Sequence, residues 1–222
     1  MMPFSQIGFV RPHDLLEIFP EALKPAKERD ERPAPAWVQE SLSKTPFVVV
    51  RRGVSSEATI PVGVRGAERN QRWAASLPTG SVKRVITPPE LMEQWTGNSS
   101  RDQEITALAA LKTLQSRWKE IAYPWGPGGS VGFELATGTA TAKAGSDLDV
   151  LIYADHPFSI EWAQWLGETI EDLPVRVDLL VETPTCGFSF HEYLRVYPRR
   201  LLLRTPHGSK LGSDPWNNSL PG

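Results

Sequence analysis

The stretch GGSVGFELATGTATAKAGSDLDVLIY, residues 128–153, decides how the second half of the chain folds. Near its end, two aspartates alternate into an apolar run, a pattern typical of a buried strand. Because successive side chains of a strand point to opposite faces, Asp147 and Asp149 are predicted to share one face and Leu148 and Val150 the other. Two carboxylates are therefore predicted to converge at the start of this strand.

Two carboxylates held this close need a cation between them. Their charges repel more strongly as water is excluded, and a divalent ion allows both groups to stay ionised. Mg²⁺ meets this need because it takes oxygen ligands and keeps coordination positions for phosphate oxygens, and Mn²⁺ is the second candidate. Asp147 and Asp149 are therefore predicted to be a catalytic, metal-binding pair.

The dipeptide Gly129-Ser130 supplies a complementary feature upstream of the aspartates. A glycine turn lets backbone N–H groups approach a phosphate without a Cβ in the way, and a serine hydroxyl adds a hydrogen bond. Gly129 and Ser130 are therefore the predicted substrate-binding residues. A phosphate cradle beside a metal-binding pair indicates phosphoryl or nucleotidyl transfer. The simpler alternatives are a solvated Asp-x-Asp turn and an ordinary Gly-Ser loop.

A third carboxylate lies in VRVDLLV, residues 175–181, which also has the pattern of a strand. Val177 and Leu179 are predicted to share one face, and Asp178 to lie on the other. If this strand neighbours the first one, Asp178 completes a catalytic triad. Its predicted role is that of a second metal ligand or of the general base for an attacking hydroxyl.

The composition of the 222 residues describes a soluble globular protein, with 40% hydrophobic and 23% charged residues. A net charge of −2 gives no basic field, so nucleic acid is not an expected partner. The apolar runs are far too short to span a membrane, and the start of the chain has no secretory pattern. The single cysteine excludes an internal disulfide, so we expect a cytoplasmic protein.

Proline and glycine positions together with hydrophobic periodicity predict two domains, residues 1–85 and 86–222. The first is predicted to be a small mixed α/β domain, and the second a mixed sheet flanked by helices. The expected helices cover residues 37–44 and 66–77, a short stretch that begins at Thr87, and residues 100–121, 160–173 and 186–196. The expected strands cover residues 46–52 and 60–66, the run that carries Asp147 and Asp149, and residues 175–181 and 199–204.

The order of these motifs, Gly-Ser followed by Asp-x-Asp and a later strand aspartate, resembles the nucleotidyltransferase superfamily of the polymerase β type. Longer motifs are similar to the malonate decarboxylase holo-acyl-carrier-protein synthase family, also called the phosphoribosyl-dephospho-CoA transferases. In the second domain these motifs are GSVGFELATG, GSDLDVLI, VRVDLLVETP, GFSFHEYLR, LLLRTPHG and DPW, and in the first they are RPHDLL, PFVVVRR and IPVGVRGAERNQRWA.

This resemblance implies an α+β fold and a specific reaction. The family joins 2'-(5''-triphosphoribosyl)-3'-dephospho-CoA to a serine of the apo acyl-carrier-protein subunit of malonate decarboxylase and releases pyrophosphate. By the resemblance, Asp147 and Asp149 carry over as the catalytic pair, whereas Asp178 carries over only from the broader superfamily. The first domain becomes a candidate contact for the donor or the carrier protein, and residues 133–144 an expected insertion beside the donor.

Two other functions are compatible with the same residues. One is a nucleotidyltransferase that uses an ordinary nucleoside triphosphate to modify a small molecule or a protein. The other is a non-catalytic module that binds a carrier protein, which the presence of both Asp147 and Asp149 disfavours.

Overall fold

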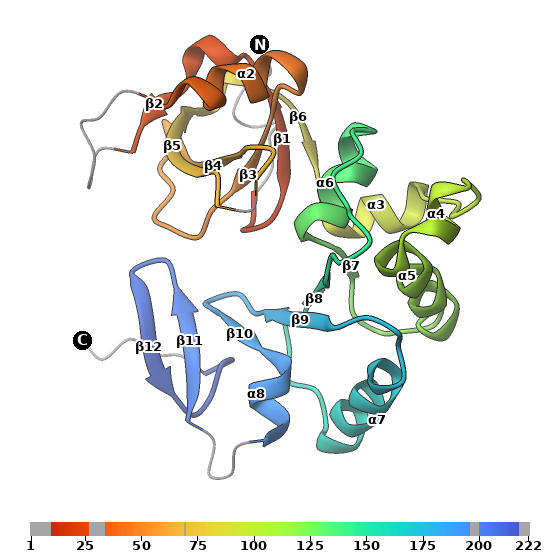
Figure 1. Cartoon of the computed structure of the whole chain (residues 1–222). Helices are drawn as coiled ribbons and strands as arrows, with labels where there is room; N and C mark the ends of the chain where they lie inside the picture. Colours follow the sequence, from red (N-terminus) through yellow and green to blue (C-terminus); the bar gives the residue numbers. More distant parts are fainter. Residues whose placement is uncertain (1–9, 27–33, 69, 196–199, 218–222) are drawn as a thin grey trace. The chain divides into compact units, whose positions relative to one another are not determined.

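The structure is a computed structural model that describes residues 10–26, 34–68, 70–195 and 200–217. The chain divides into two compact units, Met1–Thr87 and Pro88–Gly222 (Figure 1). The sequence places this boundary two residues earlier. The fold is α+β, as predicted. No helix among the described residues is both long and apolar enough to cross a membrane.

The first unit is built on a six-stranded antiparallel sheet with the strand order β2-β5-β4-β3-β1-β6. Its buried side chains form one core, to which helix α2 adds Val38 and Leu42. Its strands are β1 (Leu15–Ile18), β2 (Lys24–Pro25), β3 (Phe47–Val50), β4 (Thr59–Arg65), β5 (Arg72–Pro78) and β6 (Val82–Ile86), and its helices are η1 (Pro20–Ala22), α2 (Ala36–Lys44) and η2 (Thr79–Ser81).

The helix predicted over residues 66–77 is wrong, because the second half of this segment forms strand β5. β5 pairs with β4 along its whole length, from Thr59 opposite Pro78 to Arg65 opposite Arg72. Ala75 and Leu77 are buried at a spacing of two residues, which is the period of a strand. The pairing with β4 therefore outweighs the helix propensity of the alanines in the segment.

The second unit contains a six-stranded mixed sheet with the order β12-β11-β10-β9-β8-β7. β8 and β9 are parallel and are joined by α7, as a parallel pair requires, whereas the other neighbours are antiparallel. The strands are β7 (Trp125–Pro127), β8 (Leu148–Tyr153), β9 (Val177–Glu182), β10 (Gly187–Ser189), β11 (Leu201–Thr205) and β12 (Gly208–Gly212), and the helices are α3 (Pro88–Gln94), α4 (Arg101–Glu104), α5 (Thr106–Arg117), α6 (Gly129–Thr137), α7 (Ile160–Glu171) and α8 (Phe190–Arg195).

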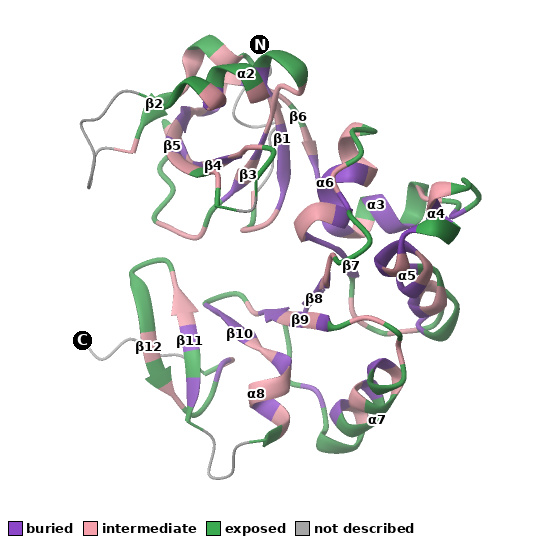
Figure 2. Cartoon of the chain, in the orientation of Figure 1, coloured by how far each residue is buried: buried purple, intermediate pink, exposed green. Residues whose placement is uncertain are grey.

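Helices α5 and α7 cover one face of this sheet. Their buried side chains join one hydrophobic cluster with the inward side chains of β8 and β9, and Figure 2 shows the buried residues running along both helices and both strands. We call the face packed on α5 and α7 the core face. Its central members are Leu108, Leu111, Leu114, Leu148, Val150, Ala163, Leu166, Val177 and Leu179.

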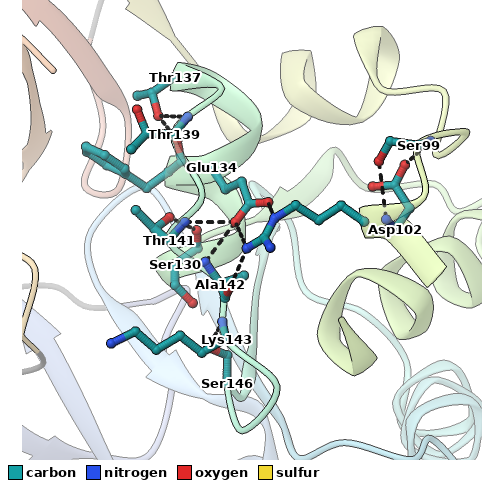
Figure 3. Close-up of polar contacts among 12 residues, drawn as sticks. Ser99, Asp102, Ser130, Glu134, Thr137, Thr139, Thr141, Ala142, Lys143 and Ser146 are labelled. Carbon is teal, nitrogen blue, oxygen red and sulfur yellow. Dashed lines mark hydrogen bonds and ion pairs between the residues drawn. The ribbon is translucent and has the colours of Figure 1, made fainter. Parts of the chain in front are cut away.

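The long helix predicted from Ser100 is interrupted, so α4 and α5 are separate helices. Ile105 between them has extended backbone angles, with φ −96° and ψ 112°. The predicted capping box at Ser100 and Gln103 is also displaced by one residue. Instead, Asp102 N–H donates to Ser99 Oγ at 3.2 Å and Ser99 N–H donates to Asp102 Oδ2 at 2.7 Å (Figure 3).

A buried carboxylate holds the loop between α6 and β8. Glu134 of α6 is 7% exposed, and its carboxylate accepts the N–H groups of Thr141 at 2.9 Å and Ala142 at 2.8 Å, together with an ion pair from Arg101. Arg101 also donates to the carbonyl oxygen of Ala142 at 2.6 Å. Figure 3 shows these contacts meeting at Glu134. The expected insertion over residues 133–144 is thus the end of α6 followed by a loop anchored on that helix.

The loop between α6 and β8 is also held to the first turn of α6. Thr141 Oγ1 donates to the carbonyl oxygen of Ser130 at 2.7 Å. Burial opposes the ionisation of Glu134, but the hydrogen bonds from Arg101, Ala142 and Thr141 outweigh it and hold the pKa of Glu134 below its ordinary value. The ionised carboxylate of Glu134 therefore stabilises the fold through its contacts with Arg101 and with the loop backbone.

We expect Glu134→Gln to lower the free energy of unfolding by about 1–3 kcal/mol at neutral pH, because a neutral amide cannot replace the carboxylate for all of its donors. A carboxylate with a lowered folded-state pKa stabilises above its unfolded pKa, and this stabilisation is lost as the pH falls through the folded value. The difference between the wild type and Glu134→Gln should therefore shrink below pH 4.5.

Thermal melts from neutral to acidic pH measure this difference. Glu120→Gln is the matched control, since Glu120 is exposed. A Glu134→Gln variant no less stable than Glu120→Gln at neutral pH would show that the anchor contributes nothing to stability.

Candidate functional site

Asp149 and Asp178 lie side by side on the central parallel strands. The register pairs Asp149 of β8 with Asp178 of β9, and strands in this relation lie about 4.8 Å apart. Their flanking residues on both strands are buried on the core face, so both aspartates belong to the opposite face, where they are half-buried. The second strand thus neighbours the first, which was the condition for Asp178 to join Asp149, and we call this face the site face.

Asp147 lies one residue before β8 and is also half-buried. The entry to the strand is fixed, because Leu148 N–H donates to the carbonyl oxygen of Arg176 at 2.9 Å. Upstream, Lys143 N–H donates to Ser146 Oγ at 2.9 Å, and the loop before it is held by Glu134. Asp147 is thus positioned by the strand on one side and by the anchored loop on the other.

Gly129 and Ser130 form the first turn of α6 instead of the predicted free-standing turn. The first N–H groups of a helix lack acceptors within the helix, and the helix dipole favours an anion at this end. The segment is joined to β8 by a hydrogen bond from Gly128 N–H to the carbonyl oxygen of Asp149 at 2.9 Å. A helix start that can accept an anion and a carboxylate are therefore brought together at one place.

Gly129 is required here for two reasons. Its φ of +57° is a left-handed conformation that favours glycine. A Cβ at this position would also overlap Asp149 Oδ2 and lie 2.6 Å from Asp149 Cγ. The glycine therefore lets the backbone at the start of α6 lie directly against the Asp149 carboxylate.

An arginine and a histidine lie near Asp178. The guanidinium of Arg176 forms an ion pair with Asp178 Oδ1 at 2.9 Å, although Arg176 is exposed. Burial lowers the pKa of His191 in α8, as do the charges of Arg195 and Arg176, while the charge of Asp178 opposes them. Burial and the nearby arginines therefore favour the neutral form of His191, and Asp178 opposes them.

Sequence reasoning did not find three of these residues. Arg101 and Glu134 lie 33 positions apart, and no local pattern predicts that they meet. His191 has no local spacing signal, because the four histidines are scattered in the sequence. It lies near Asp178 because β10 is antiparallel to β9 and leads directly into α8. The only signal was its place in the motif GFSFHEYLR.

The carboxylates of Asp147, Asp149 and Asp178 are suitable ligands for a hard cation, but they do not form a complete metal site. Carboxylate oxygens are the ligands that Mg²⁺ prefers. Among the described residues, however, no three His, Cys, Asp or Glu side chains gather closely enough to hold a metal ion. The structure places Asp149 beside Asp178, with Asp147 two residues earlier in the chain, but does not assemble the predicted triad into such a group.

Comparisons with known proteins match both units of the chain. The family model described as phosphoribosyl-dephospho-CoA transferase MdcG C-terminal domain matches residues 92–215, and its N-terminal counterpart matches residues 11–88. No solved structure is significantly similar to this chain.

Curated relatives match over almost their whole length. A phosphoribosyl-dephospho-CoA transferase of Klebsiella pneumoniae is 38% identical over 211 residues, covering 93% of this chain and 96% of the relative. The proteins of that name from Azotobacter vinelandii and Pseudomonas aeruginosa are 36% and 35% identical, covering 93% and 92% of this chain and 94% and 93% of the relatives. With both family models and these relatives in agreement, the chain belongs to the phosphoribosyl-dephospho-CoA transferase family and is an enzyme of the transferase class.

Proposed function

We propose that this transferase joins 2'-(5''-triphosphoribosyl)-3'-dephospho-CoA to a serine of the apo acyl-carrier-protein subunit of malonate decarboxylase. Family membership supports the transferred group. The observation that carries the chemistry is the pairing of Asp149 with Asp178 beside the start of α6. The release of pyrophosphate follows from the triphosphate of the proposed donor, and the acceptor is the one that the family resemblance implies.

The proposed reaction is a displacement at the α-phosphorus of the donor. The serine Oγ forms a new bond to this phosphorus, the bond from the phosphorus to the bridging oxygen of the β-phosphate breaks, and pyrophosphate leaves. The product is a phosphodiester, and the serine proton must go to a base. Asp178 is our candidate for this base because it lies beside Asp149 on the site face.

Asp147 and Asp149 would hold the proposed Mg²⁺, which neutralises charge on the triphosphate and on the departing pyrophosphate when bound. The backbone N–H groups at the start of α6 bind phosphate oxygens next to Asp149, with Ser130 as a further donor. The loop anchored by Glu134 keeps Asp147 in place. Each of these roles needs the register between β8 and β9 to be maintained.

An intact-mass measurement tests the proposal directly. Apo carrier protein is incubated with the enzyme, the triphosphoribosyl donor and Mg²⁺, and pyrophosphate is assayed in parallel. We expect one phosphoribosyl-dephospho-CoA group per carrier protein, one equivalent of pyrophosphate, and no transfer in the presence of a chelator. ATP in place of the donor tests the alternative that the enzyme uses an ordinary nucleoside triphosphate, and efficient transfer from ATP would contradict our choice of donor.

We expect Asp147→Asn and Asp149→Asn each to reduce transfer by at least about 100-fold, because an amide cannot balance the charge of the bound cation. Their thermal melts should stay close to the wild type, since asparagine is nearly isosteric with aspartate. Asp155→Asn is the control, because Asp155 is exposed beyond the end of β8. Near-normal turnover by either site variant would contradict the proposed metal site.

Asp178→Asn should lower kcat at saturating donor while donor affinity changes little, because a base acts on the acceptor hydroxyl. Arg176→Gln is the matched control, since it breaks the same ion pair but leaves the Asp178 carboxylate in place. If the two variants lose the same amount of kcat, the ion pair and not the carboxylate is what matters.

Gly129→Ala should weaken donor binding and lower transfer, because the new Cβ displaces the Asp149 carboxylate. Gly138→Ala separates this collision from backbone strain, since Gly138 has a φ of +70° but open space where a Cβ would lie. Ser130→Ala should cost less affinity, about 0.5–1.5 kcal/mol for one hydrogen bond. Calorimetry with the donor and Mg²⁺ measures all three variants. Equal donor affinity in Gly129→Ala and Gly138→Ala would place the phosphates elsewhere.

A further inference from the structure

The site face of the mixed sheet continues outward from the aspartates to the edge of the sheet. Next to the row formed by Asp149 and Asp178 lies a second row of side chains, two residues further along these strands. The register pairs Leu151 with Leu180, Leu180 with Ser189, and Leu202 with Leu211. Extending the pair Gly187–Arg204 by two residues brings Ser189 opposite Leu202. One row of mostly apolar side chains therefore leads from the site to β12.

Exposure increases along this row. Leu151 is buried, Leu180 and Ser189 are half-buried, and Leu202 and Leu211 are 40% and 60% exposed. The neighbours of Leu202 in β11, Leu201 and Leu203, are fully buried on the core face and supply the apolar contacts that hold the strand. The fold therefore does not need leucine at positions 202 and 211. Figure 2 shows the exposed residues of this hairpin.

One arginine lies on this surface. Arg204 lies between Gly187 of β10, which has no side chain, and Ser209 of β12, and the buried Glu182 of β9 lies beyond Gly187 in the same row. The segment from Leu201 to Gly212 contains an arginine and a lysine and no Asp or Glu. We call Leu202, Arg204, Ser209 and Leu211 the hairpin face. An exposed leucine pair beside an arginine is complementary to a protein surface that carries apolar side chains and carboxylates.

The transfer reaction explains why such a surface lies here. A serine side chain is short, so the body of an acceptor protein must contact the enzyme close to the reacting phosphate. β11 lies two strand spacings from Asp178, about 10 Å away, and presents its leucine on the same face. A protein seated on the hairpin face is thus within reach of the site.

We propose that the hairpin face is the docking surface for the acceptor protein, which binds it through an acidic surface with exposed apolar side chains. This inference rests on the proposed function, because it assumes a protein acceptor. Leu202 and Leu211 provide the apolar contact, and Arg204 provides the charge that orients the acceptor toward Asp149 and Asp178. The docking surface and the site face are one continuous surface of the second unit.

The test is transfer by the Leu202→Ser/Leu211→Ser double variant and by Arg204→Glu, with the apo acyl-carrier subunit of malonate decarboxylase as acceptor. Both variants should raise the KM for this acceptor by about tenfold or more, as losses at central interface contacts do. Donor affinity by calorimetry should be unchanged. Arg204→Glu should also weaken the dependence of the KM on salt concentration.

The matched control is Ile160→Ser. Ile160 is 42% exposed, close to the exposure of Leu202, but lies at the start of α7, the helix that covers the core face. This variant should keep the wild-type KM. An unchanged KM in the double variant, or an equal rise in Ile160→Ser, would overturn the proposal.

Two further results separate the inference from the proposed function. If the wild type transfers nothing to the carrier protein, the proposed acceptor is wrong, but direct binding of the carrier protein by calorimetry still tests the surface. Binding lost only in the double variant supports the docking surface, and absence of binding to the wild type overturns it. If sedimentation shows that the double variant dissociates a dimer while the acceptor KM is unchanged, the face binds a second copy and the proposal is also overturned.

Discussion

The pairing of β8 with β9 is the constraint on which the site depends. Like charges directly opposite one another on adjacent strands destabilise a sheet, yet the register places Asp149 beside Asp178. The register cannot shift by one residue, because that shift would turn the buried valines and leucines of β8 or β9 away from α5 and α7. The hydrophobic core therefore holds two carboxylates in a position that they would not adopt by themselves, and Arg176 offsets part of the repulsion at Asp178.

The surrounding elements bring further groups to the same pair. The start of α6 approaches Asp149 at a distance that only glycine allows, and α8 brings His191 to the other side of Asp178. Asp147 is the last residue of a loop, and a loop would ordinarily be the least ordered part of such a site. The loop is ordered because Glu134 is buried and ionised and takes its hydrogen bonds from the loop backbone and from Arg101. A buried carboxylate is costly without such partners, so this contact specifies one loop conformation.

Much of the candidate site could be predicted from the sequence, because it rests on alternation in two strands. The apolar residues of DLDVLIY and VRVDLLV fix which side chains are buried, and the aspartates then share the other face. Whether Asp178 acts as a base or a metal ligand stays a prediction. The start of α6 was expected as a turn, since Gly-Ser alone does not distinguish a turn from the first residues of a helix.

The predictions from the sequence were wrong, or missed a contact, where residues distant in the sequence determine the local structure. Residues 72–78 became a strand because β4 pairs with them, although their alanines favour a helix. The hydrophobic periodicity continues through Ile105, so it does not reveal the interruption there. No periodicity relates Arg101 to Glu134 either, because they are far apart in the sequence.

The anchored loop also offers a position for a fluorescent label. Residues 143–145 are exposed between the anchor and Asp147, and the single cysteine, Cys186, is buried. A thiol introduced at Ala144 could therefore carry a single fluorescent label beside the site, so that arrival of the donor would be followed as an optical signal in the otherwise native enzyme.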